Sequence, residues 1–205
     1  KYGMKVMSFG FISGNETPVI WRGPLVSRMT EQFFRDVDWG KLDVLVLDLP
    51  PGTGDIQLTL TQKLRMTGAI IVTTPQDIAL ADVRKGADMF KKVNTPVLGV
   101  IENMSSLLLK GKIHTQDSGI VEINGRKTNI SSDGLFSLEI DLFKTGGGQK
   151  ESRRLDVPLL GKIPISEQIT ISTDEGRPLT TLDDSNEICQ IYNAIAKKIS
   201  SIINM

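Results

Sequence analysis

Apolar residues recur along the chain in short runs that have the length of β-strands. The runs are KVMSFGF (Lys5–Phe11), VLVL (Val44–Leu47), AIIVTT (Ala69–Thr74), VLGVI (Val97–Ile101) and, more weakly, PLLGKI (Pro158–Ile163). Three of these runs are continuously apolar, which is typical of strands buried on both faces of a parallel sheet. The pattern therefore predicts a parallel sheet that is covered by helices.

Helical spacing is found between the apolar runs. Asp77 suits an N-cap and is followed by apolar residues one helical turn apart, and two further helices are predicted at Pro24–Asp36 and Gln57–Met66. The clearest pattern comes last, where Asp184 and Glu187 resemble a capping box. The apolar stripe that follows consists of Ile188, Ile191, Tyr192, Ile195, Ile199 and Ile202.

Strands that alternate with helices predict an α/β fold with a doubly wound, mostly parallel sheet and helices on both faces. The segment Ser105–Thr145 breaks this alternation because it has no strong period. Within it, Asn124-Gly125 lies between two alternating segments, which is a strong hairpin signal. We interpret residues 105–145 as a hairpin-bearing insertion within a single, partial domain that spans residues 1–205.

Composition narrows the possible partners. The chain has 205 residues, of which 40% are hydrophobic, and its 24 basic and 24 acidic residues cancel. A net charge of zero gives no general attraction to nucleic acid or to an anionic membrane, and neither is expected as a partner. The single cysteine, Cys189, excludes an internal disulfide framework. We expect a reducing compartment, either the cytoplasm or an organelle such as a mitochondrion or plastid.

The stretch VLVLDLPPGTGDIQLTL, Val44–Leu60, carries the most chemistry. Asp48 ends an apolar run, and ligands of open parallel sheets bind beyond the carboxyl ends of the strands. In P-loop NTPases an acid at this place helps to hold Mg²⁺ against the nucleotide phosphates. The glycines that follow let backbone N–H groups approach an anion, and Asp55 is placed to cap the next helix or to position a water. The alternative is that Asp48 only caps a turn that the glycines shape.

This string resembles the Mrp-type P-loop ATPases of the MinD/ParA superfamily, which act as carriers or scaffolds in iron–sulfur cluster assembly. Further segments carry the same resemblance: VIWRGP, GAIIVTTPQDIALADVRKGADMFKKVNTPVLGVIENMS, DLFKTGGGQK and VPLLGKIPISEQI. It implies ATP and Mg²⁺ as cofactors, a homodimer, and client or assembly proteins of the iron–sulfur pathway as partners.

The resemblance also implies roles for individual residues. Asp48 would be the Walker B acid that faces Mg²⁺ indirectly and, with Asp55, would serve hydrolysis. Gly52 and Thr53 would belong to switch II, which senses the γ-phosphate.

On the nucleoside side, Asn103 would read the adenine edge, and Ile163 and Pro164 would flank the ring. The alternatives are that Asn103 satisfies a turn and that Pro164 ends a strand.

Two departures from the family pattern limit these roles. The chain contains no GxxxxGK[ST] loop, since Gly111-Lys112 and Gly161-Lys162 are each followed by isoleucine. Family members carry that loop before the YGxKVMS segment with which this chain begins. We therefore expect a C-terminal portion of a longer ATPase that hydrolyses ATP very poorly by itself.

The second departure concerns the [4Fe–4S] cluster that two family subunits share through Cys-x-x-Cys motifs. The corresponding window here, SSLLLKGKIHTQDSG, has no cysteine, and a dimer of this chain offers only the two Cys189 thiols. Iron–sulfur clusters are held by several thiolates, so these residues do not supply the cluster ligands. His114, the only histidine, is not expected to bind metal because it lacks partner ligands.

Three hypotheses about function follow. The first is an ATP-dependent carrier or scaffold in iron–sulfur assembly. The second is a nucleotide-switched spatial organiser of the ParA or MinD kind, in which Lys197 and Lys198 beside the last apolar stripe suit a membrane surface. The third is a non-enzymatic relative that handles neither nucleotide nor cluster. We adopt the first, because a protein that no longer handles nucleotide has no physical need for the Asp48–Asp55 string.

Overall fold

The computed structural model describes residues 2–8, 10–13, 23–49, 55–114, 119–181 and 185–204. The chain divides into two compact units. The first holds the residues up to Thr67 together with Lys85–Pro96, and the second holds Gly68–Arg84 and everything from Val97 onward. The single domain expected for residues 1–205 stays a prediction.

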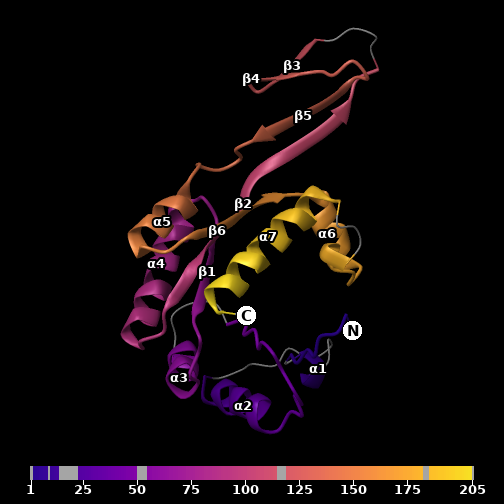
Figure 1. Ribbon diagram of the computed structural model, residues 1–205. Coiled ribbons are helices and arrows are strands. Elements are labelled where there is room, and N and C mark those ends of the chain that lie inside the picture. The colour runs from indigo at the N-terminus through magenta and orange to yellow at the C-terminus, as the bar shows by residue number, and fades with distance from the viewer. Residues whose placement is uncertain are drawn as a thin grey trace. The chain divides into compact units, whose positions relative to one another are not determined.

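The second unit is built on a mixed sheet with β2 (Val97–Lys112) at its centre. β1 (Ala69–Thr73) and β6 (Leu159–Ile165) both pair with β2 in parallel, and β5 (Leu135–Ile140) pairs with its outer half in antiparallel register (Figure 1). The three parallel strands are among the runs that the apolar pattern predicted. Continuous apolar sequence suits them because both faces of this part of the sheet are covered.

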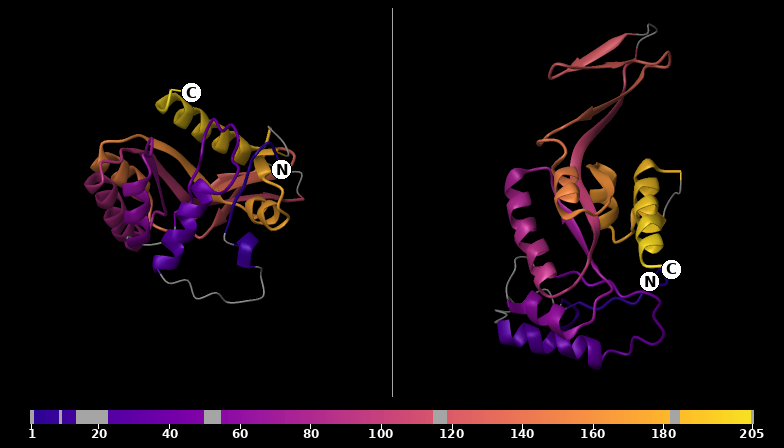
Figure 2. Two further views of the ribbon diagram at one scale, coloured as in Figure 1. Left: turned by 90° about the horizontal axis from the view of Figure 1, so that it is seen from below. Right: turned by 60° about the vertical axis from the view of Figure 1, so that its left-hand side comes forward.

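Helices cover the two faces of this sheet. α5 (Gly147–Leu155) and the beginning of α4 (Asp77–Lys92) lie on one face, and α7 (Glu187–Ile202) lies on the other (Figures 1 and 2). The predicted stripe of α7 packs on the sheet through a buried cluster of Ile101, Leu160, Ile163 and Ile195. The helices on both faces confirm the predicted fold class.

The start of α7 differs from the predicted capping box. Asn186 is the N-cap, and its side-chain oxygen accepts the N–H of Ile188 at 2.8 Å. Asp184 lies outside the described residues. The same unit also contains α6 (Glu167–Asp174) and a short 3₁₀ turn at Leu179–Thr181.

The described residues of the region 105–145 form an arm on the same unit (Figure 1). β3 (Ile120–Ile123) and β4 (Arg126–Asn129) form the predicted hairpin, with Asn124 and Gly125 at φ 51° and 75° in its turn. The expected start of this region at Ser105 is not a break in the structure, because β2 runs on to Lys112. The strand continues there because β5 supplies a new hydrogen-bonding partner.

The regular elements in the described part of the first unit are helices. It contains α1 (Gly10–Ser13), α2 (Gly23–Arg35) and α3 (Asp55–Lys63), and α2 and α3 correspond to two predicted helices. Lys63 forms an ion pair with Glu31 between α3 and α2.

Two predicted strands are wrong. Met4–Ser8 is irregular and Gly10 begins a short helix, while Val44–Leu47 forms no strand. Val46 is 84% exposed. A parallel strand needs a hydrogen-bonding neighbour and apolar cover on both faces, and neither apolar segment has a strand partner among the described residues. Apolar composition alone did not make these segments strands.

Among the residues described, none of the helices is both long enough and apolar enough to cross a lipid bilayer.

Candidate functional site

The predicted nucleoside-side residues meet at the carboxyl ends of β2 and β6. Asn103 of β2 is the register partner of Ile163 in β6, and Pro164 follows directly. Partners in neighbouring strands point to the same face of a sheet, so Asn103 and Ile163 share the face on which α7 lies. The side chain of Ile163 is only 6% exposed and packs in the core, whereas Asn103 and Pro164 are partly exposed. The adenine site at these residues stays a prediction.

The backbone is irregular beside Asn103. Met104 has a left-handed φ of 53°, and the register between β2 and β6 shifts between Asn103 and Leu107. The N–H of Met104 donates to Oδ1 of Asn103 at 2.9 Å. This bond orients the side-chain amide and leaves its NH₂ group available as a donor. Unusual backbone of this kind costs about 1–3 kcal/mol and is concentrated at functional sites.

The residue before Asn103 in β2 carries a buried carboxylate. Glu102 is 1% exposed, and its Oε2 accepts the N–H of Gly148 in α5 at 2.6 Å. Its Oε1 lies 3.6 Å from Nζ of Lys162, the register partner in β6. The N-terminus of a helix attracts anions, and here that place is taken by an internal carboxylate. The N–H of Gly148 is therefore not available to a nucleotide phosphate.

The glycines that begin α5 permit its close approach to the sheet. A Cβ on Gly147 would lie 2.7 Å from the carbonyl oxygen of Pro75, in the loop after β1, and one on Gly148 would lie 2.7 Å from Cβ of Glu102. The ends of β1, β2 and β6 and the start of α5 thus converge at one edge of the sheet. Parallel sheets bind ligands at this edge.

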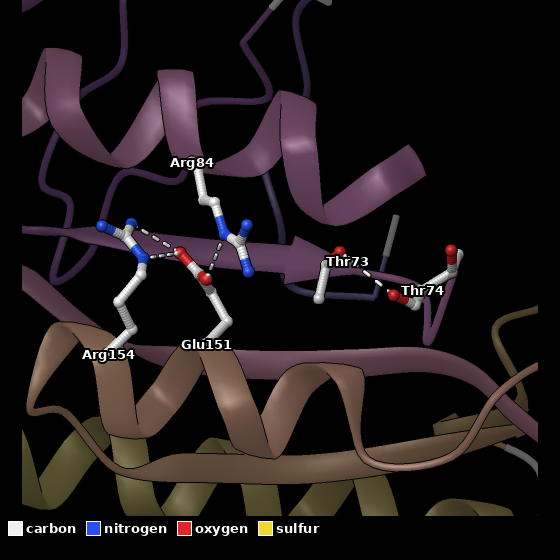
Figure 3. A network of polar contacts seen from close by, with 5 residues as sticks. All are labelled: Thr73, Thr74, Arg84, Glu151 and Arg154. Atoms are coloured by element: carbon white, nitrogen blue, oxygen red, sulfur yellow. Dashed lines mark hydrogen bonds and ion pairs between the residues drawn. The ribbon is translucent and has the colours of Figure 1, made fainter. Parts of the chain in front are cut away.

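A second buried carboxylate forms an ion pair between α5 and α4. Glu151 is fully buried and lies between two arginines, Arg84 of α4 and Arg154 of its own helix (Figure 3). Arg154 donates to Oε1 at 2.6 and 2.8 Å, and Nε of Arg84 lies 3.4 Å from Oε2. Both arginine side chains are partly exposed. The network holds the helices that flank the strand ends.

Asp77 at the start of α4 forms an exposed ion pair with Lys144, in the loop before α5. The hydrogen bond and charge of Lys144 hold the pKa of Asp77 below its usual range, and Lys150 and Arg84 add smaller effects. A lowered folded-state pKa means that the pair stabilises the fold at pH values above the ordinary carboxyl pKa. That contribution is lost as the pH falls through the lowered value.

Lys144→Ala is expected to raise the pKa of Asp77 toward the ordinary value, because it removes the two largest causes of the shift. An NMR titration of the Asp77 carboxyl carbon measures this directly, and 1 M salt should weaken the same shift in the unmodified chain. An unchanged titration curve in the variant would show that Lys144 does not set this pKa.

The predicted phosphate-side residues belong to the first unit. Asp48 is exposed and lies in irregular backbone, and Asp55 begins α3. Gly52 and Thr53 lie outside the described residues. Because Asp48 and Asn103 are in different units, their geometry relative to each other is not defined. The metal and catalytic roles of Asp48 and Asp55 stay predictions.

Among the described residues, no group of three or more histidine, cysteine or acidic side chains is placed to hold a metal ion. The single cysteine, Cys189, is fully buried in α7, and its thiol donates to the carbonyl of Leu179 at 3.0 Å. This thiol is buried and hydrogen-bonded in the core. The residues present therefore do not fit a cysteine-held iron–sulfur cluster.

Sequence reasoning missed Glu102 and its contact with Gly148. The two residues belong to the strings ENMS and KTGGGQK that carried the resemblance, but the contact between them could not be seen there. The signal was a glutamate at a position of β2 where an apolar residue would be expected.

Comparison with known proteins identifies the family. A family profile described as ParA, NUBPL iron-transfer P-loop NTPase matches residues 1–118 and 133–200. The chain is 40% identical to an iron–sulfur cluster carrier protein of Synechocystis over 100% of its own length and 51% of the relative. It is 41% identical to the iron–sulfur cluster transfer protein NUBPL of Dictyostelium discoideum, over 97% of this chain and 54% of that protein.

The structural comparison agrees. A nucleotide-binding protein of Archaeoglobus fulgidus, solved in complex with ADP, matches with a TM-score of 0.54 and 33% identity. The match covers 75% of this chain and 53% of that protein. The chain thus spans about half the length of the relatives it matches. From the strand order, the Asp48–Asp55 string and these matches, we conclude that the chain belongs to the NUBPL iron-transfer family of P-loop NTPases.

Proposed function

We propose that the protein containing this chain is an ATP-dependent carrier or scaffold that delivers iron–sulfur clusters to client proteins. The observation that carries the proposal is the register of β2 and β6, which puts Asn103 beside the Ile163-Pro164 segment at the carboxyl edge of the sheet. A purine base can be held there between an apolar wall and a side-chain amide. Iron–sulfur carriers that are about 40% identical along the whole chain support the same function.

In this proposal, the second unit provides the nucleoside side of the site. Asn103 presents its NH₂ group to a ring nitrogen of adenine, and its Oδ1 has a further lone pair for the amino group. Pro164 covers one face of the ring, and Ile163 supports this wall from the core. From the family resemblance, Asp48 would help to hold Mg²⁺ at the phosphates of bound ATP, in a homodimer of the protein.

The cluster is cargo in this proposal. Its thiolate ligands are not supplied by this chain, which has one cysteine. They would come from other parts of the protein or from the client.

The test uses the full-length protein, loaded anaerobically with iron and sulfide, and follows cluster transfer to an apo-ferredoxin with and without Mg-ATP. Asn103→Ala is expected to weaken ATP binding about tenfold, the cost of losing a hydrogen bond to the base. Cluster transfer should therefore fall at low ATP and recover at saturating ATP. Asp48→Ala should lower transfer at every ATP concentration, because a lost Mg²⁺ contact is not replaced by more nucleotide.

Two results would contradict the proposal. ATP binding without any ATP effect on transfer would remove the carrier function. ATP-dependent attachment to anionic vesicles, with no transfer, would instead indicate the spatial organiser.

A further inference from the structure

Glu102 is a buried acid to which the proposed nucleotide chemistry gives no task. Burying a carboxylate is costly unless its oxygens are paired, and glutamate is rarely found fully buried. Both oxygens of Glu102 are paired, one with the N–H of Gly148 and the other with Lys162. The bond to Gly148, at 2.6 Å, has the short length of a charge-assisted hydrogen bond. The carboxylate therefore ties three elements together: β2, β6 and α5.

The position of these two contacts of Glu102 is important because Asn103 is the next residue in β2. Side chains alternate along a strand, so Glu102 and Asn103 point to opposite faces of β2. α5 contacts β2 on the face to which Glu102 points. The opposite face of the strand carries Asn103, the residue predicted to recognise the base. Lys162 holds the same carboxylate from β6, one residue before Ile163.

After Asn103 the regular pairing between β2 and β6 is interrupted. The pairing of β2 with β6 resumes only at Leu107, and Met104 between them is left-handed. The backbone at an irregularity of this kind is not fixed by regular ladder bonds, so neighbouring contacts determine its position. Glu102 provides two buried contacts of this kind, one residue before the register pair of Asn103 and Ile163 that precedes the irregular segment.

We propose that Glu102 is a positioning residue for base recognition, which fixes Asn103 by clamping β2 to the start of α5 and to Lys162. This inference rests on the proposed function, because Asn103 reads a base only if the protein binds an adenine nucleotide. Glu102 lies on the opposite face of the strand and acts through Asn103, without touching the ligand.

The experiment uses the ¹⁵N-labelled 205-residue chain, with ADP and GDP as probes in NMR titrations. Glu102→Ala removes both contacts and is expected to weaken ADP binding about tenfold, the effect of one lost charge-assisted bond. GDP binding should change less, because a displaced Asn103 affects the adenine-specific contact most. Glu102→Gln keeps an oxygen that accepts the N–H of Gly148, so it should restore most of the preference for ADP over GDP.

Glu151→Gln is the matched control. Glu151 is also a fully buried carboxylate on the α5 side of the sheet, but its partners are Arg84 and Arg154. The substitution should lower stability and leave the ratio of ADP to GDP affinities unchanged. If Glu151→Gln narrows that ratio as much as Glu102→Ala does, the effect is a general loss of structure and the inference is overturned.

A second readout needs no nucleotide. In the ligand-free chain, Glu102→Ala should shift the side-chain amide signals of Asn103 and speed hydrogen exchange at the N–H of Met104, whereas Glu151→Gln should do neither. Unchanged signals in Glu102→Ala would overturn the inference whether or not ADP binds. If the unmodified chain binds no ADP at millimolar concentration, base binding by this chain is contradicted, and the ligand-free signals still decide whether Glu102 positions Asn103.

Discussion

Replacing both Arg84 and Arg154 with methionine is expected to lower the free energy of unfolding by about 3–5 kcal/mol. The reason is the position of Glu151, whose side chain is fully buried between the two guanidinium groups. Without them the carboxylate has no cation in the interior, and burying an unpaired charge is one of the largest single costs in a protein. Methionine keeps much of the apolar stem of arginine, so packing loss contributes little to the difference.

Removing the acid should cost less than removing the two bases. In Glu151→Gln the arginine side chains, which are 51% and 36% exposed, can turn their charged ends to water. The difference in unfolding free energy between the two variants therefore distinguishes the cost of an unpaired buried charge from the cost of losing an ion pair. Urea unfolding followed by circular dichroism measures both variants against the unmodified chain. Equal losses in the two variants would show that Glu151 reaches solvent when its partners are removed.

The second large effect is expected at the start of α5. Gly147→Ala should destabilise the chain by about 1–3 kcal/mol, the usual cost of overpacking. The added Cβ would lie 2.7 Å from the carbonyl oxygen of Pro75 and 2.9 Å from its Cα. These are backbone atoms that cannot turn aside, so the start of α5 would have to move away from the loop after β1. Chemical denaturation measures the loss, and the ADP titration described above should show weaker binding as well.

Gly86→Ala is the control for this substitution. Gly86 also lies in a helix, α4, but nothing lies within 4 Å of a Cβ built on it. Alanine should stabilise the chain there by about 0.5–1 kcal/mol, because glycine is the poorer helix former. The two glycine-to-alanine changes are thus expected to have opposite signs. A stabilising Gly147→Ala would mean that α5 is not in close contact with Pro75.

The local signals in the sequence were sufficient for most elements of the second unit. Apolar runs predicted β1, the first part of β2 and, more weakly, β6, because strands covered on both faces are rich in apolar residues. The hairpin at Asn124-Gly125 was equally predictable, since few other residue pairs adopt positive φ twice in succession. The same reasoning failed at Lys5–Phe11 and Val44–Leu47. An apolar run shows that a segment is suited to burial, but only a neighbouring strand makes it part of a sheet.

By itself, the sequence determined the fold class and the family resemblance, and it provided candidate nucleotide-site residues that stay predictions. Composition alone also shows that the chain has a single cysteine, which is too few to supply all the thiolates of a cluster by itself. Only the tertiary structure decided that Asn103 lies opposite Ile163, that β2 continues into the arm, and that Glu102 and Glu151 are buried acids with partners far away in sequence. These features depend on pairing register and on contacts between residues 46 to 67 positions apart, which no local pattern encodes.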